Sequence, residues 1–276
     1  MGKVLIPKAA QLHRVKPGAT VDLGSIEPDD VSAAPGDKET TQAASAALVE
    51  RLAELQDVFW ARQEERLLVV LQGIDTSGKG GTVEHVFGAV NPAGLRVTSF
   101  KAPSESELAR DFLWRVHANV PQNGEIAVFD RSHYEDVTAA RVLGLVPEKR
   151  WKQRYDHINA FEEMLTDEGT TVIKVLLHIS KAEQKRRLEA RLDRPEKHYK
   201  MRLSDLDTRK QWDDYQEAFA DMVARTSTAH APWHVVPADK KWYRNWAVTT
   251  IVTGVLEDMD LEWPESPDDL TGVTIE

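Results

Sequence analysis

The chain has 276 residues, a formal net charge of −10 and no cysteine, which excludes a disulfide framework and thiolate chemistry. Its hydrophobic fraction of 41% and charged fraction of 29% are typical of a globular protein, and no stretch approaches the roughly 18–20 apolar residues of a membrane span. The acidic balance argues against nucleic acid as a partner, and the absence of cysteine and of a secretory signal predicts a cytoplasmic protein without membrane attachment.

Residues 1–40 predict an irregular N-terminal arm, because they contain four prolines with scattered Gly and Asp. Lys3, Lys8, Arg14 and Lys16 make its beginning basic. The arm either lies on the folded domain or forms a solvated tail, since chain termini are often poorly ordered.

After the arm, the hydrophobic spacing alternates between helix and strand periods. In chain order it predicts a helix over 40–65, a strand over 67–72, a helix over 81–90, a strand over 95–100, a helix over 104–119, a strand over 126–130, helices over 134–145 and 147–168, a strand over 171–179, helices over 181–192 and 204–226, a strand over 233–236 and a helix over 241–259. Ser104 followed by Glu107 predicts a capping box at the start of its helix.

Strands that alternate with helices and are apolar on both faces favour a parallel sheet covered on both sides. We therefore predict a three-layer α/β/α fold with a five-stranded parallel sheet. Residues 41–260 are expected to form this single domain, and residues 261–276 a C-terminal tail.

The first apolar strand runs into the sequence Gly-Ile-Asp-Thr-Ser-Gly-Lys-Gly-Gly over 73–81, which leads into a helix. The spacing G-x4-G-K in this context is typical of a phosphate-binding loop, whose backbone amides and lysine surround phosphate. A glycine-rich connector is the alternative. The candidate phosphate-binding residues of the loop are Gly73, Thr76, Ser77, Gly78, Lys79, Gly80 and Gly81.

Gly80 departs from the usual pattern, because P-loop enzymes normally place a Ser or Thr hydroxyl on Mg²⁺ at this position. A hard cation still requires oxygen ligands, and Asp75 inside the loop is the obvious replacement. A carboxylate beside phosphates is unfavourable unless a metal ion lies between them. A turn or capping role for Asp75 is the alternative.

Asp130 follows four apolar residues at the carboxyl end of the third strand. This is the Walker B arrangement, in which the carboxylate holds the metal ion, and ligands of open α/β sheets bind at this edge. Arg131 can bind a phosphate bidentately, or alternatively form a salt bridge to a helix carboxylate.

A third feature is a basic segment after the fourth strand, and Arg187 and Arg191 share one helix face within it. Its basic residues are Lys185, Arg186, Arg187, Arg191, Arg194, Lys197, Lys200, Arg202, Arg209 and Lys210. Small P-loop kinases close such a segment over the transferring phosphates, whereas the alternative is a solvated charged face. The histidines form no metal-binding pattern. Trp114 is either a core residue or part of a nucleotide pocket.

These motifs together resemble the family-2 polyphosphate kinases. The resemblance rests on the loop over 73–81, on Phe-Asp-Arg-Ser-His-Tyr-Glu-Asp over 129–136, on Arg187-x3-Arg191 with Pro195-x-Lys197-x2-Lys200, and on Ala-Pro-Trp-His over 231–234. It implies a P-loop kinase fold with a helical lid at about 187–210. It also implies transfer of a terminal phosphoryl group between inorganic polyphosphate and an adenine or guanine nucleotide, with Mg²⁺ or Mn²⁺. At Tyr134, Glu135 and Asp136 the sequence is similar to that of family members that accept both AMP and ADP.

The resemblance also implies roles for individual residues. The catalytic residues are Asp75, Lys79, Asp130, Arg131 and Arg191, with Asp75 and Asp130 as metal ligands. The phosphate-binding residues are those of the loop with Arg131, Arg187, Arg191, Lys197 and Lys200. Lys8 and its neighbours would guide the polymer, and the long helices would join the chain into a homo-oligomer, either a dimer or a tetramer.

Two rival functions remain from the sequence. The first is an ATP-dependent nucleoside monophosphate kinase or another small-molecule kinase. The second is a nucleotide-dependent switch, which would require a base-recognition element such as Asn-Lys-x-Asp, and the sequence has none.

Overall fold

Five parallel strands form the centre of the molecule. The computed structural model describes residues 11–275. The strands are β1 (Arg66–Gln72), β2 (Leu95–Ser99), β3 (Ile126–Asp130), β4 (Thr170–His178) and β5 (Trp233–Pro237). Their order in the sheet is β2-β3-β1-β4-β5, and every neighbouring pair is parallel. The predicted five-stranded parallel sheet is confirmed.

The central strand β1 is buried on both faces, which explains its unbroken apolar sequence. It lies between β3 and β4, and the register places Leu71 opposite Asp130. The carboxyl ends of β1 and β3 therefore lie side by side, with the loop after β1 next to the segment after β3.

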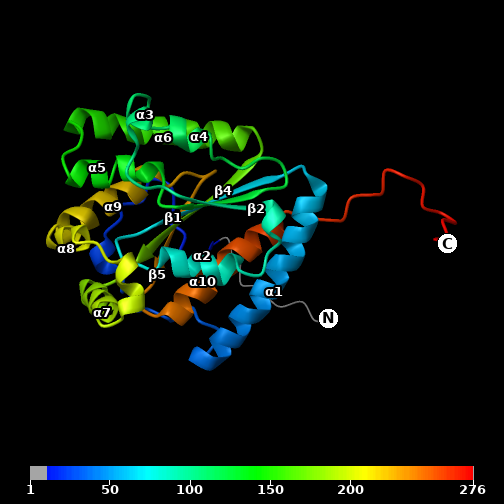
Figure 1. Cartoon of the computed structure of the whole chain (residues 1–276), viewed down its shortest axis with the longest axis horizontal. Helices are drawn as coiled ribbons and strands as arrows, with labels where there is room; N and C mark the ends of the chain where they lie inside the picture. The colour runs from blue at the N-terminus through cyan, green and yellow to red at the C-terminus, as the bar shows by residue number, and fades with distance from the viewer. Residues whose placement is uncertain (1–10, 276) are drawn as a thin grey trace.

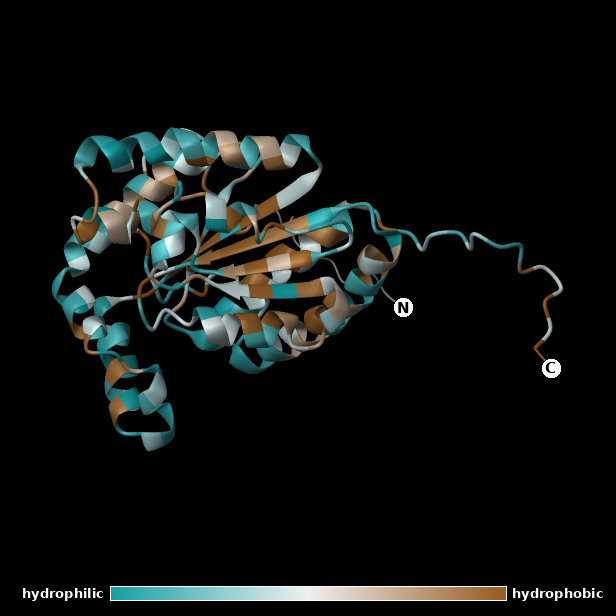
Figure 2. Cartoon of the chain, turned by 45° about the horizontal axis from the view of Figure 1, so that its top comes forward, coloured by the Kyte–Doolittle hydropathy of each residue, from teal (hydrophilic) through white to brown (hydrophobic). Residues whose placement is uncertain are grey.

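Helices cover both faces of the sheet, as Figures 1 and 2 show, with the hydrophobic strands between layers whose outer surfaces are hydrophilic. One layer contains α1 (Lys38–Arg62), α2 (Lys79–Phe87) and α10 (Lys241–Asp258), with α10 packed against the other two. The opposite layer contains α6 (Glu148–Asp167) and α9 (Trp212–Thr226). This arrangement is the predicted three-layer architecture.

The remaining helical elements are short and lie mostly around the carboxyl edge of the sheet. They are η2 (Leu23–Ser25), η3 (Pro92–Gly94), α3 (Glu105–Leu108), α4 (Trp114–His117), η4 (His133–Asp136), α5 (Ala139–Val142), α7 (Lys181–Leu192), η5 (Pro195–Lys200) and α8 (Ser204–Lys210). In Figure 1, α7 and α8 lie at the left, at one end of the sheet.

The predicted continuous helix over 104–119 is wrong, because this segment forms two single turns, α3 and α4. The capping box is present, since the Ser104 side chain accepts from the backbone of Glu107 and the Glu107 side chain accepts in return. The Asp111 carboxylate then accepts from the Leu113 amide at 3.0 Å and begins a new turn. An Asp side chain that bonds to nearby backbone in this way competes with helix continuation.

The helix predicted over 134–145 is also wrong, and the helix predicted over 204–226 is interrupted. The first becomes η4 and α5, separated by Thr138, whose hydroxyl bonds back to the Tyr134 carbonyl at 2.8 Å. The second breaks at Gln211, where the backbone leaves helical geometry between α8 and α9. Near these breaks the Tyr134 hydroxyl donates to Glu162 of α6 at 2.7 Å, and the Gln211 side chain donates to the Val142 carbonyl at 3.5 Å. Local periodicity does not reveal these tertiary partners.

A buried polar network fixes the segment that follows β3. Lys174 of β4 donates to Glu162 of α6 at 2.5 Å and to the Tyr134 hydroxyl at 2.9 Å. Tyr134 donates to the same carboxylate at 2.7 Å, and His133 lies 3.2 Å from it. All four side chains are buried, so the network holds η4 against the core immediately after Asp130.

The described part of the N-terminal arm lies on the domain, which decides between the two expectations for it. The Val15 amide donates to the Trp233 carbonyl at 2.8 Å, and the Val235 amide donates to the His13 carbonyl at 3.0 Å. Leu23 is buried in the main core. Lys3 and Lys8 lie outside the described residues.

The segment after α10 runs away from the body of the molecule, to the right in Figure 1, and its described residues form no helix or strand. Within residues 11–275, none of the helices has the length and apolar character that crossing a bilayer requires.

Candidate active site

The loop between β1 and α2 has a backbone that only glycine can follow at two points. Gly73 has φ +147°, and a Cβ there would lie 2.6 Å from the Ser77 hydroxyl oxygen and 2.8 Å from the Leu177 carbonyl oxygen. Gly78 has φ +107° and precedes the first residue of α2, with no side chain capping the helix. The loop therefore leads directly into a helix N-terminus, where backbone amides and the helix dipole favour an anion.

Lys79 turns back into this loop. Its Nζ donates to the Gly73 carbonyl at 2.6 Å, and the side chain is buried. Burial and the nearby Arg131 lower the pKa of Lys79, against the opposing effect of Asp130 and Asp75. The lysine is thus a desolvated cation at the centre of the loop, where its interaction with phosphate is strengthened by the lower local dielectric.

Asp75 and Arg131 form an ion pair across the two strand ends, with Arg131 Nη2 donating to Asp75 Oδ1 at 2.6 Å. Arg131 has a left-handed backbone, φ +63°, which is uncommon for a residue with a side chain and is found at functional sites. Burial lowers the pKa of Arg131, but Glu135, Asp75 and Asp130 outweigh burial and raise it. The structure therefore brings Asp75, Lys79, Asp130 and Arg131 together, as the sequence predicts.

Arg187 binds the loop backbone from the side of α7. Its Nη1 donates to the carbonyls of Thr76 and Ser77 at 2.9 and 2.8 Å, and its Nη2 donates to the Ala238 carbonyl at 2.6 Å. Its Nε donates to Glu183 at 2.6 Å. Arg187 is buried and joins the loop to the segment after β5, so the structure places it within the base of the site.

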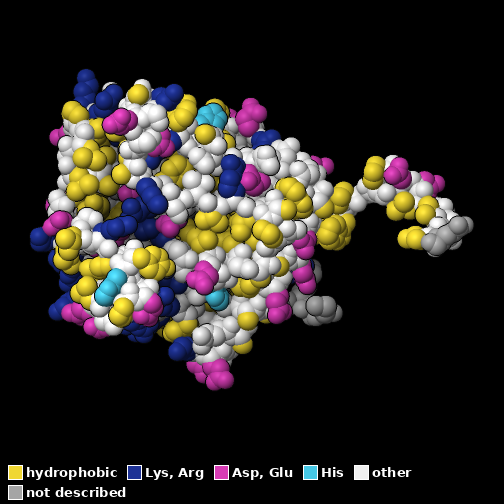
Figure 3. All heavy atoms as spheres, viewed as in Figure 1, with side chains coloured by type: hydrophobic (Ala, Val, Ile, Leu, Met, Phe, Trp, Pro, Cys, Tyr) yellow, Lys and Arg dark blue, Asp and Glu magenta, His cyan; other side chains and the backbone are white. Residues whose placement is uncertain are grey.

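The other three predicted basic residues lie farther along the same segment. Arg191 Nη1 donates to the Lys200 carbonyl at 3.2 Å and lies 3.5 Å from the Asp205 carboxylate. Burial raises the pKa of Asp205 in α8, and Asp75 adds to this effect. Lys197 and Lys200 form no side-chain hydrogen bond or ion pair within residues 11–275. Figure 3 shows Lys and Arg side chains gathered at the left of this face, beside α7 and α8.

The comparisons with known proteins agree with this geometry. The family model of polyphosphate kinase 2 matches residues 36–264. The chain belongs to the polyphosphate kinase 2 family.

Individual members of the polyphosphate kinase 2 family cover nearly the whole chain. An AMP/ADP-polyphosphate phosphotransferase from Meiothermus ruber is 51% identical over 92% of this chain and 95% of the relative. An ADP-polyphosphate phosphotransferase from Rhodopseudomonas palustris is 38% identical over 92% of this chain and 91% of the relative. The crystal structure of polyphosphate kinase 2 from Arthrobacter aurescens superposes with a TM-score of 0.91, at 46% identity, over 95% of this chain and 93% of that one.

Glu135 follows Asp130 and Arg131 in the same segment, and the sequence assigns it no catalytic or binding role. Burial raises its pKa and Asp75 adds to this, whereas Arg131 and Lys79 oppose it. With the Gln72 amide oriented to satisfy both of its polar atoms, Gln72 donates to Glu135 at 3.0 Å and accepts from the Ser132 amide at 3.1 Å. The sequence includes Glu135 in the motif over 129–136 but gives no reason to assign it a role of its own.

Arg244 of α10 also lies at the loop and was not predicted. A Cβ on Gly78 would lie 1.9 Å from Arg244 Nη1, so the guanidinium group rests directly against the glycine. The Arg244 side chain donates to Asn245 and forms no ion pair with a described residue. Burial and Arg187 lower the pKa of Arg244 to about 10. Its distance in sequence from every motif explains why the pattern did not reveal it.

The donor set suits a hard divalent cation. Asp75 and Asp130 supply carboxylate oxygens at adjacent strand ends, and phosphate oxygens can complete the coordination of Mg²⁺ or Mn²⁺. Within the described residues there is no group of three His, Cys, Asp or Glu side chains arranged around a metal. A metal at this site would therefore depend on substrate oxygens, as is usual for Mg²⁺ in phosphoryl transfer.

Proposed function

We propose that this chain is a polyphosphate:nucleotide phosphotransferase that moves a terminal phosphoryl group between inorganic polyphosphate and AMP or ADP. The observation that carries the proposal is the 51% identity to an AMP/ADP-polyphosphate phosphotransferase over almost the entire length of both chains. The convergence of the loop, Asp130 and Arg131 at one edge of the sheet supports the same reaction class.

Phosphoryl transfer requires positioning and charge neutralisation more than covalent chemistry. The loop amides, the N-terminus of α2 and Lys79 bind one phosphate group. Arg131 is fixed by Asp75 before substrate binds, so its guanidinium group is oriented at no further entropic cost. Because the reacting oxygens belong to the two substrates, we expect no phosphoenzyme.

Asp75 and Asp130 would hold Mg²⁺ or Mn²⁺, which neutralises developing charge on the phosphate oxygens when bound. Asp75 also helps to orient the attacking nucleotide phosphate. Arg191 and the basic residues Lys197 and Lys200 belong to the lid, which closes over the transferring chain and excludes water. Arg187 supports the loop from beneath.

The donor identifies the reaction. Incubation with polyphosphate and ADP, or polyphosphate and AMP, in the presence of Mg²⁺ should produce ATP or ADP, detected by chromatography. A protein that ignores polyphosphate and requires ATP as donor would instead be an ordinary small-molecule kinase. Tight guanine-nucleotide binding without phosphoryl transfer would indicate a switch.

We also propose that the chain forms a homo-oligomer, a dimer or a tetramer. Apolar side chains such as Leu143 and Leu145 are more than half exposed beside α5 and are available for contact with a second subunit. Light scattering coupled to size-exclusion chromatography measures the mass directly, and a monomer at micromolar concentration would contradict this proposal.

A further inference from the structure

Several large apolar side chains are exposed between the end of α7 and α8. Over residues 192–206, which we call the lid face, Leu203 is 82% exposed, and Leu192, Tyr199 and Leu206 are exposed as well. None of these four side chains belongs to the hydrophobic core. Scattered exposed apolar residues need no explanation, but several in one short segment indicate an interaction surface.

The lid face is also basic. Its four basic side chains form no ion pair with a described residue, and they are Arg194, Lys197, Lys200 and Arg202. Its exposed carboxylates are Asp193 and Glu196, because the third, Asp205, is buried and lies 3.5 Å from Arg191. The partner that fits this surface therefore combines negative charge with apolar side chains.

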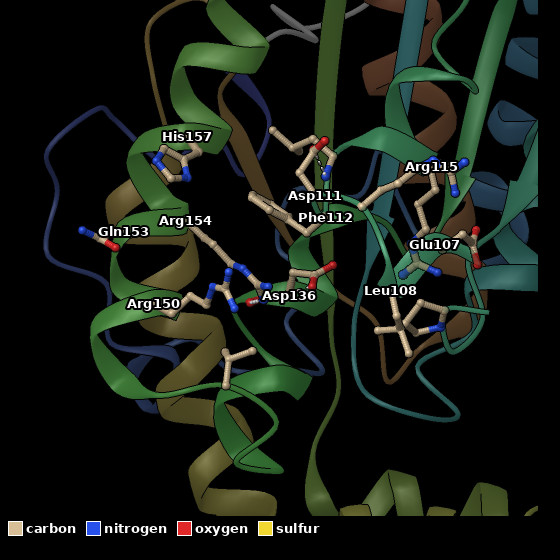
Figure 4. A pocket seen from close by; sticks show the side chains of 14 residues that line it. Glu107, Leu108, Asp111, Phe112, Arg115, Asp136, Arg150, Gln153, Arg154 and His157 are labelled. Carbon is tan, nitrogen blue, oxygen red and sulfur yellow. Dashed lines mark hydrogen bonds and ion pairs between the residues drawn. The ribbon is translucent and has the colours of Figure 1, made fainter. Parts of the chain in front are cut away.

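Arg154, at the same edge of the sheet, shows the contrast with a basic side chain that has tertiary partners. In the cavity of Figure 4, Arg154 Nη1 donates to the Asp136 carboxylate at 3.0 Å, and its guanidinium lies 4.7 Å from the centroid of the Phe112 ring. On the lid face, Lys200 lies 5.4 Å from the ring centroid of its chain neighbour Tyr199, and both side chains remain exposed. The lid face thus lacks the tertiary partners that Arg154 has.

The tail after α10 has the complementary composition. Residues 262–276 contain five acidic residues and no Lys or Arg. Its large apolar side chains Trp263, Leu270, Val273 and Ile275 are all exposed, and in Figure 1 the tail runs away from the body of the molecule. Most of it lies beyond the family model, which ends at residue 264. Segments that combine acidic with apolar residues become ordered when they bind a partner.

The tail is too short to cover the lid face of its own chain. It begins at the amino edge of the sheet, where Arg62 Nη1 donates to the Glu262 carbonyl at 3.4 Å, whereas α7 and α8 lie at the other end of the molecule in Figure 1. The chain from Glu262 to Leu270 spans at most about 29 Å when fully extended. The nine residues of β4 alone extend about 30 Å between these two edges. Leu270 can therefore meet a lid face only on another copy.

We propose that the lid face binds the C-terminal tail of a second copy of this chain. The apolar side chains of the tail cover Leu203 and its neighbours, and the tail carboxylates pair with the basic side chains of the lid face. One consequence rests on the proposed function. Because Lys197 and Lys200 also serve the polymer, a docked tail competes with polyphosphate.

The chain has no cysteine, so an introduced pair reports a single contact. Leu203→Cys/Leu270→Cys, after mild oxidation and electrophoresis without reductant, should give a band of two chains joined by a 203–270 disulfide, identified by mass spectrometry. Asp57→Cys/Leu270→Cys places the first thiol on the exposed surface of α1 and is the matched control, with severalfold less dimer. A yield no greater than that of the control would overturn the proposal. A 203–270 disulfide confined to the single-chain band would also overturn it, because the tail would then bind its own lid face.

A kinetic measurement tests the competition. Asp268→Asn/Asp269→Asn removes two charges from the tail and should lower KM for polyphosphate about threefold with kcat unchanged. Glu50→Gln/Asp57→Asn removes two charges from the exposed surface of α1 and should leave KM for polyphosphate as in the wild type. Equal KM values in the two double variants would show that the tail does not compete with the polymer.

Cross-linking needs no turnover, which separates this inference from the proposed function. Excess polyphosphate should lower the yield of the 203–270 disulfide between chains, and an unchanged yield would contradict a shared surface. If the wild type makes no ATP from polyphosphate, the proposed function fails, yet the cross-link still supports or overturns docking of the tail on the lid face.

Discussion

The sequence and the structure give different information about why position 80 is a glycine. The missing hydroxyl suggested a metal held by carboxylates. In the structure, a Cβ at Gly80 would meet no atom within 4 Å, so a larger residue would fit. Steric need therefore does not explain this glycine, whereas Gly78 beside Arg244 has both a positive φ and no free space.

We predict opposite effects for two neighbouring alanine substitutions. Gly78→Ala should destabilise the loop and abolish transfer, because the methyl group would overlap Arg244 and the backbone would be strained. Gly80→Ala lies inside α2 and should raise the free energy of unfolding by roughly 0.5–1 kcal/mol. Urea denaturation of both variants measures the free energy of unfolding, and an activity assay measures transfer. Equal losses of stability in the two variants would contradict the conclusion that Gly80 has free space around it and Gly78 does not.

Asp75 should be essential for catalysis and dispensable for folding. Asp75→Asn removes the charge that Arg131 and the metal require, so we expect turnover to fall below detection while the melting temperature stays within a few degrees. Asp57→Asn, at an exposed position of α1, is the matched control and should keep full activity. Near-normal turnover of Asp75→Asn would exclude it as a metal ligand.

Among the elements, η4 is held in place by the buried network of Lys174, Glu162, Tyr134 and His133. The network thereby also fixes the residues on either side of η4. Burial alone would raise the pKa of Glu162, but Lys174 and His133 outweigh burial and lower it. The carboxylate is thus ionised and depends on its partners. Removing one charge of a buried pair leaves the other uncompensated, whereas removing both does not.

Lys174→Met should therefore lower the free energy of unfolding by about 3–5 kcal/mol. The double variant Lys174→Met/Glu162→Leu should recover much of this loss, because no buried charge is left without a partner. Chemical denaturation of both variants and the wild type tests this. A double variant less stable than the single one would show that the ion pair itself is a net source of stability.

The contact between the arm and β5 should make stability depend on pH. His234 bonds to the Leu12 carbonyl at 2.7 Å, and burial lowers the pKa of His234 to about 4. Below its unfolded pKa of about 6.5, the unfolded chain binds a proton that the folded chain does not. This contribution is therefore complete above about pH 6.5 and is lost as the pH falls toward 4, by roughly 3 kcal/mol in total.

His234→Asn keeps a donor at the position of Nδ1 for the Leu12 carbonyl and removes the titration. Its free energy of unfolding should fall less steeply between pH 6.5 and 4 than that of the wild type, as measured by denaturation at several pH values. The exposed His230→Asn should retain the wild-type slope. If both variants behave alike, His234 is not the titrating group.

Long, strongly periodic elements were predictable from sequence, and short ones around the site were not. The strands β1, β3, β4 and β5 were predictable because their continuous apolar runs are buried on both faces of the sheet, and α1 and α6 because their apolar positions recur at helical spacing on one face. The segments after β2 and β3 fail because Asp111 and Thr138 bond to local backbone, and Tyr134 is drawn to Glu162. Arg244 reaches the loop only through the packing of α10, which a linear motif does not contain.

The whole molecule is acidic, although polyphosphate is a polyanion. The two are compatible because the basic side chains are distributed unevenly over the surface. The net charge is −10, yet basic residues gather beside α7 and α8 in Figure 3. The acidic remainder of the surface repels a polyanion from other sites, so binding is concentrated at this edge of the sheet.

Raising NaCl from about 0.05 to 0.5 M should consequently weaken polyphosphate binding more than nucleotide binding, because salt screens exposed charges and the polymer carries many more of them. We expect KM for polyphosphate to rise at least severalfold while KM for ADP rises much less. Initial rates at several salt concentrations measure both. Equal salt dependence would indicate that the polymer contacts no extended basic surface.

The attachment of Arg187 to the loop limits which residues could move in the lid proposed above. Arg187 fastens the middle of α7 to the loop and to the segment after β5, and Arg209 donates to the Lys181 carbonyl at 2.6 Å at the start of the same helix. Both ends of the basic segment are thereby bonded to the rest of α7, the loop and the segment after β5. In the lid proposed above, the hinge would lie beyond Arg187, near the end of α7 at Leu192, and the moving part would be shorter than the basic segment, carrying Lys197 and Lys200 but not Arg187.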